Sequence, residues 1–297
     1  MKRSIACVLL LMLLLPMLAC ASGTPIEASM VVNGTITVNP DGSVRGYALD
    51  KENTLPSYVR QIVQKTVSGW MFVPVKTDGK AVTARTGMTL RLVADWHDKE
   101  HATIWVAGAE FGCDSWRTSR EYTETCPSGS MVTEAQRTPP HYPTDAAFHG
   151  VGGEVFLVLD VGRDGRVMRA AVRKVDLYSM IPRQPKYRKV LADASLTAAR
   201  KWKFHVPTVG PEADRDHWIV VVPVRYKFQM SGTGTLLRKP RSQWTAYVPG
   251  PVNNIPWADE DEGGAAGSGD AVAGSGVFVR DTRFELKTPL AGDPGKT

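Results

Sequence analysis

The sequence is poor in the residues and motifs that mark common enzyme and cofactor sites. It has four cysteines among 297 residues, and none of them form a Cys-x-x-Cys pair. It also lacks a nucleophile elbow and a phosphate-binding glycine loop followed by Lys-Ser/Thr, and the glycines of 263–276 neither follow a strand nor open a helix. We therefore predict that the protein is not an enzyme and holds no cofactor or metal.

No apolar run is long enough for a comfortable membrane span. The stretch from Ile5 to Ala21 has 17 residues, about 25 Å as a helix, whereas a spanning helix needs roughly 20 residues. Pro16 interrupts it, and Lys2 and Arg3 precede it. This pattern predicts a signal peptide over residues 1–20 and export from the cytoplasm.

Two modes of cleavage are open. Met17-Leu18-Ala19-Cys20 resembles a lipobox, whereas Ala19-Cys20-Ala21 also offers small residues to ordinary signal peptidase. If Cys20 is lipidated, its acyl chains form a durable anchor. Ala21 and Ser22, with no Asp, then point to the outer membrane. We predict a periplasmic protein, anchored there as a lipoprotein.

After cleavage only Cys113 and Cys126 remain beyond the N-terminus. In an oxidising periplasm we expect them to form a disulfide, which would stabilise the fold by roughly 3 kcal/mol on the chain-entropy model. The alternative is a pair of free buried thiols.

The formal net charge is +6, and residues 139–228 hold most of the excess, with fifteen Lys/Arg against nine Asp/Glu. An exported protein does not normally meet nucleic acid, so we expect no nucleic-acid partner. An anionic envelope surface or an acidic peptide is a better counterpart. A surface that is merely soluble is the alternative.

An internal repeat divides the chain. Asp41-Gly42 and Asp164-Gly165 each lie between alternating β-branched residues, which predicts two tight hairpins. Trp70-Met71-Phe72-Val73-Pro74 then corresponds to Trp202-Lys203-Phe204-His205-Val206-Pro207. Before each Trp, apolar residues recur at helical spacing, in the first copy Val59, Ile62, Val63 and Val67, and in the second Leu191, Ala194 and Ala198.

An extended segment follows each Trp motif, at 88–96 and at 218–228. Each copy therefore reads strand, Asp-Gly turn, strand, amphipathic helix, strand. We predict an α+β fold of two small modules, each a three-stranded antiparallel sheet with a helix packed on one face. We call residues 28–96 the first module and residues 138–229 the second module.

The second module resembles the C-terminal domain of TonB proteins. The resemblance rests on Tyr142-Pro143, Ala146, Gly150 and Gly153, the Asp164-Gly165 turn, and Trp202-Lys203-Phe204. The first module shares only the Asp-Gly hairpin and the Trp-x-Phe-x-Pro end, so it resembles a degenerate copy. The resemblance covers about a third of the chain.

The resemblance implies that the second module binds an extended peptide, such as the TonB box of an outer-membrane receptor, beside its last strand. Strand addition uses unpaired backbone groups at a sheet edge. Pro223 lies in this strand and itself favours an edge position. The predicted partner-binding residues are Tyr142, Pro143, Trp218, Val220, Val222, Val224 and Tyr226. For Tyr142, groove contact and plain packing are both open.

Other features give the remaining predictions. We expect a disulfide-containing connector over 97–137, and over 230–297 a Gly-rich tail with one strand, 277–287, that docks on a module or stays unfolded. His97 and His101 have the spacing of a helical zinc pair, but no third ligand is signalled, so we interpret the segment as a charged loop.

Three functions remain in competition. The first is a protein that binds an envelope protein or extended peptide through the second module. The second is a structural scaffold, with the modules paired edge to edge or the chain in a homodimer. The third, a true energy transducer, is the least favoured, because it would need an uncleaved N-terminal span.

Overall fold

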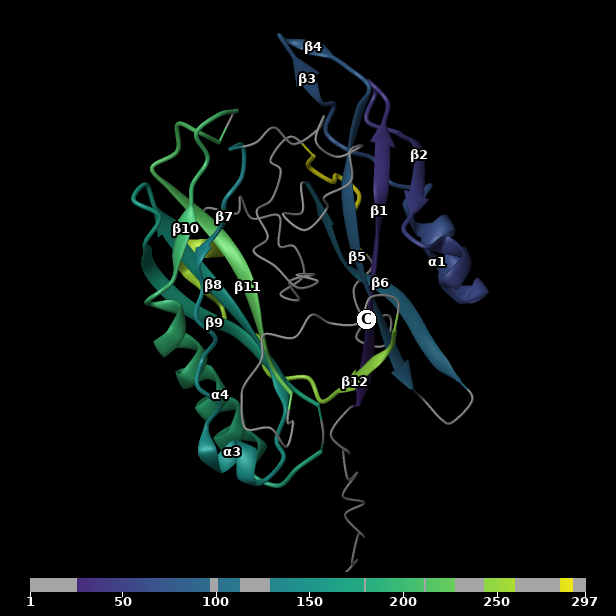
Figure 1. The fold of residues 1–297 in the computed structure, drawn as a ribbon. Helices are drawn as coiled ribbons and strands as arrows, with labels where there is room; N and C mark the ends of the chain where they lie inside the picture. The colour runs from purple at the N-terminus through teal and green to yellow at the C-terminus, as the bar shows by residue number, and fades with distance from the viewer. Residues whose placement is uncertain are drawn as a thin grey trace, which may run out of the picture.

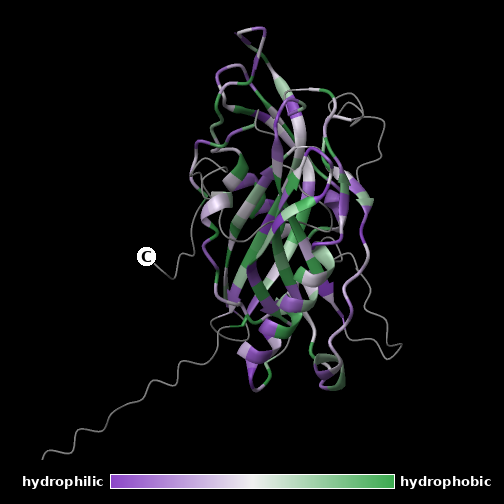
Figure 2. Ribbon diagram, turned by 90° about the vertical axis from the view of Figure 1, so that its left-hand side faces the viewer, coloured by the Kyte–Doolittle hydropathy of each residue, from purple (hydrophilic) through white to green (hydrophobic). Residues whose placement is uncertain are grey.

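A computed structural model describes residues 26–96, 101–112, 129–178, 180–210, 212–227, 243–259 and 284–290. Two antiparallel sheets stand side by side in it, and each carries one long helix on its outer side (Figure 1). The green, apolar residues concentrate in the strands at the middle of the molecule, while the loops and helix surfaces are mostly purple or white (Figure 2). Each sheet therefore buries one face beneath its own helix.

The first sheet has five strands, in the order β12-β1-β5-β6, with β2 also paired to β1. Its strands are β1 (Glu27–Val38), β2 (Val44–Leu49), β5 (Ala84–Trp96), β6 (Ala102–Phe111) and β12 (Thr245–Tyr247). The prediction of three strands was wrong here. Residues 102–111 were assigned to the connector and β12 to the tail, but both complete this sheet. Val106 and Phe111 of β6 enter the same core as β1 and β5, which explains the pairing.

The second sheet has three strands in the order β11-β8-β9. Its strands are β8 (Gly153–Gly162), β9 (Val167–Leu177) and β11 (His217–Tyr226). The short helix α3 (Thr144–Phe148) precedes it, and α4 (Gln184–Ala199) packs across one face. The first sheet carries α1 (Ser57–Val67) in the matching place, after the single turn η1 (Glu52–Thr54).

The two Asp-Gly turns have the same tertiary role. Gly42 and Gly165 have φ of 89° and 73°, which favours glycine. Each also lies against the segment after the helix, because a Cβ on Gly42 would meet the Phe72 oxygen at 2.1 Å and one on Gly165 the Phe204 oxygen at 2.1 Å. Each position therefore requires glycine for two reasons, the positive φ and the close contact with the backbone oxygen.

The buried helix faces differ slightly from the predicted ones. In α1, Val59, Val63 and Val67 are fully buried and Ile62 lies at the margin. In α4 the buried residues are Tyr187, Leu191, Ser195 and Ala199, so Ala194 and Ala198 flank this face instead of forming it. The hydroxyl of Ser195 bonds the Leu191 oxygen at 2.8 Å, which satisfies it inside the core. Both helices end three residues before their Trp, so Trp70 and Trp202 lie beyond the last turn.

Short strands complete the fold. β7 (Thr133–Gln136) pairs with β10 (Lys203–His205), and β3 (Lys76–Thr77) pairs with β4 (Lys80–Ala81). Residues 284–288 pair with Met71–Val73 of the first module, so this part of the predicted late strand docks there. Residues 277–283 lie outside the described residues. The last helix, α5 (Pro256–Asp259), is one turn long.

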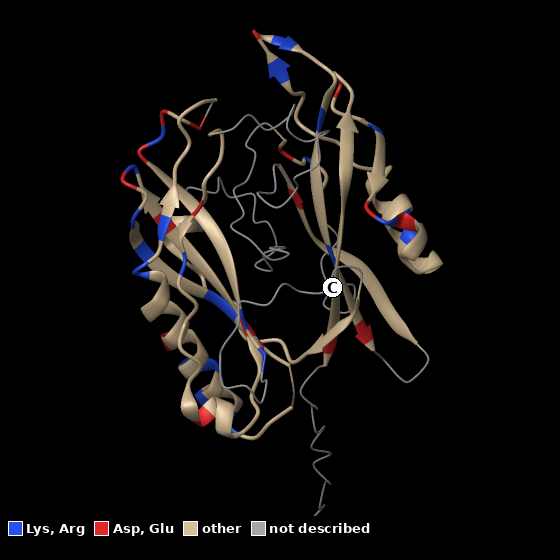
Figure 3. Cartoon of the chain, in the orientation of Figure 1, with Lys and Arg blue, Asp and Glu red and all other residues tan. Residues whose placement is uncertain are grey.

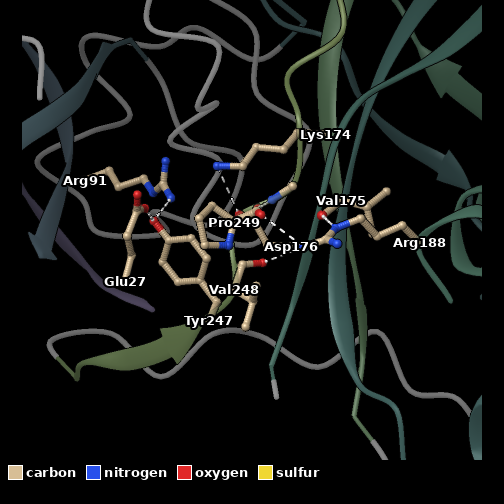
Figure 4. A network of polar contacts seen from close by, with 10 residues as sticks. Glu27, Arg91, Lys174, Val175, Asp176, Arg188, Tyr247, Val248 and Pro249 are labelled. Carbon is tan, nitrogen blue, oxygen red and sulfur yellow. Dashed lines mark hydrogen bonds and ion pairs between the residues drawn. The ribbon is translucent and has the colours of Figure 1, made fainter. Parts of the chain in front are cut away.

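The segment 243–259 joins the two sheets. β12 pairs with residues 27–29 of β1, and Val248 then forms a bridge with Leu177 of β9. Tyr247 lies between the sheets, with Arg91 of β5 and Lys174 of β9 both 5.5 Å from its ring centre (Figure 4). Its hydroxyl accepts a bond from Arg91 at 2.8 Å and donates to Glu27. One stretch of the predicted tail thus holds both sheets together.

Candidate site at the edge of the second sheet

β11 is an edge strand. It pairs with β8 along its whole length, from His217 opposite Gly162 to Tyr226 opposite Gly153. On its other side, no strand or bridge pairs with it within the described residues. Backbone groups along such an edge can accept a further strand. Pro223 lies opposite Phe156 in this strand, and a residue without an N–H is tolerated where the missing donor would point away from the ladder.

The opposite edge of the same sheet is covered by the chain itself. The Val248 N–H donates to the Leu177 oxygen at 2.7 Å, and the Leu177 N–H donates back at 3.1 Å. Farther along β9, the Asn253 N–H donates to the Arg173 oxygen at 2.7 Å and the Asn253 side chain to the Val172 oxygen at 2.9 Å. Among the described residues, the second sheet therefore has one covered edge, at β9, and one open edge, at β11.

The side chains predicted to bind a partner point into the core instead. Trp218, Val220, Val222, Val224 and Tyr226 all pack in the cluster beneath α4 and are buried. The ring N–H of Trp218 donates to the Glu212 oxygen at 3.1 Å, and the Tyr226 hydroxyl bonds Ser195 at 2.9 Å. These five were predicted as residues of the partner-binding strand, and their side chains share one buried face because alternate residues of a strand point to the same side.

Tyr142 also belongs to the core. Its hydroxyl donates to the Val151 oxygen at 2.7 Å, and its ring meets that of Tyr226 edge to face with centres 5.3 Å apart. Burial raises the pKa of Tyr142 to about 12. Of the two alternatives for this residue, the structure has the packed one. Pro143 is half-buried and caps the start of α3, so the Tyr-Pro pair positions the chain that leads into β8.

The face of the sheet opposite α4 carries buried charges. Arg225 of β11 and Glu154 of β8 form a buried ion pair at 2.6 Å. At the other end of β11, the buried Asp160 carboxylate contacts Arg169 at 2.6 Å and His217 at 2.8 Å. Arg169 in turn lies over the ring of Trp257, 4.7 Å from its centre. The contacts of His217 and Arg225 hold the two ends of β11 against β8.

Apolar residues of the tail cover part of this same face. Ile255 and Ala258 pack on Val158 of β8, together with Ile219 of β11. Val221, farther along β11, is half-buried and is not part of this cluster. Basic side chains follow β9 and α4 with acidic ones among them (Figure 3), in keeping with the basic excess of the second module. A strand added to β11 would therefore lie beside Val221 and near the Arg225 pair.

The corresponding edge of the first module is occupied. Val38 lies opposite Ala84 as Val161 lies opposite Trp218, so β5 takes the place of β11. β6 then pairs with β5 from Met88 opposite Phe111 to Trp96 opposite Ala102. The matching half of β11, from Val222 onward, has no such neighbour among the described residues. The two modules thus differ at the position where a partner strand would bind.

Several predicted residues lie outside the described residues, namely Cys20, Cys113, Cys126 and His97. Within the part of the chain that the structure describes, no three His, Cys, Asp or Glu residues gather as a possible metal site. The helices of that part include none that is both long enough and apolar enough to cross a membrane.

Comparison with known proteins identifies the region of the second sheet as similar to a known domain. Residues 138–228 match the family of the Gram-negative bacterial TonB protein C-terminal, and the region is TonB C-terminal domain-like. Protein TonB of Xanthomonas campestris pv. campestris strain B100, and that of strain ATCC 33913, are each 34% identical over 95 residues. The match covers 32% of this chain and 37% of either relative, so the chain spans little more than a third of their length.

Proposed function

We propose that the second module binds an extended segment of an envelope protein by strand addition at the outer edge of β11. The observation that carries this proposal is the asymmetry of the second sheet, whose β9 edge is covered by residues 248–253 while its β11 edge has no strand partner among the described residues. A TonB C-terminal domain-like region with one open edge suits a partner recognised mainly through backbone hydrogen bonds.

The partner class follows from the chemistry of the edge. Because the side chains of β11 from Val222 to Tyr226 are all buried, a bound strand gains affinity from backbone pairing, and the half-buried Val221 is the nearest side chain that can select its sequence. Ordering a flexible peptide offsets much of this gain, so we expect weak binding. The matched relatives bear the name Protein TonB, which makes the periplasmic segment of an outer-membrane receptor the first partner to test.

The proposed location is the periplasm, with a lipid anchor at Cys20 in the outer membrane. The signal sequence and the similarity to a Gram-negative envelope protein family support it. In cells, Cys20→Ala should move the mature protein from the membrane fraction to the soluble periplasm. A full-length, membrane-bound precursor would instead favour the energy-transducer function. We otherwise propose neither energy transduction nor catalysis for this protein.

Two proline substitutions test the edge. Successive residues of β11 point their N–H groups to opposite sides, and Pro223 indicates that odd-numbered residues point outward. Val221→Pro should therefore keep the fold and lose partner capture, whereas Val222→Pro should lose a bond to β8 and destabilise the domain. Val221→Ala is the matched control, since it shortens the side chain and keeps the donor.

The measurement is capture of proteins from envelope extract by the mature chain, with circular dichroism of each variant. Capture should survive in Val221→Ala and fail in Val221→Pro. Equal capture by Val221→Ala and Val221→Pro would contradict strand addition at the β11 edge.

A scaffold is the second candidate, and the joining segment 243–259 favours it. Tyr247 and Val248 tie β1 to β9, so the two sheets form one body. If β11 pairs in a homodimer, its amides should be protected from hydrogen exchange at high protein concentration and lose protection on dilution. Protection that appears only when the captured partner is added would favour the binding function.

A further inference from the structure

The residues after each helix form an edge that is separate from β11. In the first module the Phe72 N–H donates to the Gly42 oxygen at 2.8 Å, and in the second the Phe204 N–H donates to the Gly165 oxygen at 2.8 Å. Each segment is thereby fixed over its Asp-Gly turn on one side. The backbone groups on the other side of each segment can pair with a further strand.

A short strand occupies that other side in both modules. In the second module it is β7, with Phe204 opposite Glu134. In the first it is the segment 284–288, with Phe72 opposite Leu286. Here the Val73 N–H donates to the Glu285 oxygen at 2.9 Å, and the Lys287 N–H donates to the Met71 oxygen at 2.8 Å. The Met71 N–H also donates to the Thr288 hydroxyl at 2.8 Å.

The two short strands anchor themselves in the same way. Two positions before the residue opposite the Phe, the segment that contains each strand places one apolar side chain in the core, Val132 just before β7 in the second module and Phe284 in the first. Val132 is fully buried and Phe284 is 3% exposed. Leu286 and Leu290 pack partly against the first core as well. The first module therefore holds a strand with one buried aromatic anchor and two lesser aliphatic contacts.

The source of the strand differs. β7 comes directly before the second module, whereas Thr288 lies 217 positions from Met71. The 24 residues between Asp259 and Phe284 include the Gly/Ala/Ser-rich sequence 263–276. Because the segment and its site belong to one chain, they bind each other intramolecularly, so even a weak site can stay filled.

We propose that the first module is a strand-binding module whose ligand is the chain's own segment 284–290, held reversibly at Met71–Val73. The ligand class is an extended peptide with an aromatic residue followed two positions later by an aliphatic one, as in Phe284-Glu285-Leu286. The bonds to the site are few and lie at its surface, so the segment opens more readily than the core strands and can be replaced by a peptide of the same pattern.

Exchange with a free peptide tests this in the full mature chain. The protein carries an isotope label, and an unlabelled peptide with the sequence of residues 282–292 is added at millimolar concentration. The amide of Lys287 in the protein should then exchange with solvent at least tenfold faster, because the peptide displaces it from the Met71 oxygen. The Val73 amide should keep its protection, because the glutamate carbonyl of the peptide replaces that of Glu285. A peptide with Phe284→Ala should change neither amide.

A second measurement uses the full chain with Phe284→Ala. With its own anchor removed, the chain should bind the fluorescently labelled native peptide at least tenfold more tightly than the wild type does. The proposal is wrong if Lys287 stays protected at saturating peptide, if Val73 and Lys287 lose protection together, or if Phe284→Ala abolishes the protection of Leu90 in the core of the first module. The last result would make Phe284 a fixed core residue. Since β11 takes no part, the two proposals stand or fall separately.

Discussion

The two modules share a hairpin, a helix and a following strand, yet they expose different edges. In the first, β6 covers the strand that corresponds to β11, β2 and β12 together cover β1, and residues 284–288 cover Met71–Val73. In the second, β7 and the 248–253 segment cover two edges, and β11 keeps one open among the described residues. The same local design thus has different edges covered in the two modules, depending on which other segments of the chain pair with it.

The largest effect we expect comes from the Trp residues that the modules share. Trp202 and Trp70 are 1% and 2% exposed, and the Trp202 ring N–H also donates to the Thr138 oxygen at 2.8 Å. Trp202→Ala should destabilise the protein by about 3 to 5 kcal/mol in urea unfolding, and Trp70→Ala by a similar amount. A destabilisation of only a few tenths of a kcal/mol for either variant would mean that the two modules do not share this core contact.

The glycines of the Asp-Gly turns sharpen the same comparison. Gly42→Ala and Gly165→Ala should each cost about 3 kcal/mol, since a Cβ at 2.1 Å from a backbone oxygen adds to an unfavourable φ. Gly46→Ala is a control, because a Cβ there meets nothing within 4 Å. Thermal unfolding of the three variants would measure this. Equal stability of all three would contradict the shared contact between turn and Phe.

The joining segment decides whether the modules unfold together. Tyr247→Phe keeps the ring between Arg91 and Lys174 but removes the hydroxyl bonded to Arg91 and Glu27, which should cost about 1 to 2 kcal/mol. Denaturant unfolding followed by amide exchange in each module should then separate into two transitions. Tyr47→Phe, in the first module and away from this network, should leave a single transition. If Tyr247→Phe unfolds in one step like the wild type, other contacts couple the modules.

The smallest effect that we expect is a difference between the two modules in their stability at alkaline pH. Burial raises the pKa of Tyr142 to about 12 and also raises the pKa of Tyr226 and Tyr178, all in the second module, and it raises the pKa of Tyr47 in the first module. Because the folded pKa lies above the unfolded value near 10, this stability is complete below pH 10 and is lost as the pH rises through 12.

Protection of the second-module amides should therefore fall before that of the first between pH 10 and 12. Tyr142→Phe should weaken this dependence, at a cost of about 1 kcal/mol at neutral pH from the lost bond to Val151. An unchanged alkaline profile in Tyr142→Phe would show that Tyr142 takes no part in it.

Prediction from the sequence succeeded where the determinant was local. Asp-Gly between alternating residues indicated both hairpins, and the Trp-x-Phe motif located the end of each helix to within three residues. It failed for β6, because residues 102–111 follow the charged sequence 97–101 and were taken together with the polar stretch beyond them. Ser195 was missed in the same way, since its hydroxyl is satisfied by Leu191 and Tyr226 and only the fold reveals these partners.

The sequence by itself determined the repeated strand, turn, helix and strand, and the likeness of residues 138–228 to a TonB C-terminal domain. It could not determine which edges the chain covers, because β12 and residues 284–288 reach their partners across about two hundred positions. These pairings are made by backbone N–H and C=O groups, which almost every residue has. No side-chain pattern therefore indicates which strand will be the partner. The tertiary structure alone decided that Tyr142 and the alternate residues of β11 face the core, and that β11 has no second strand partner among the described residues.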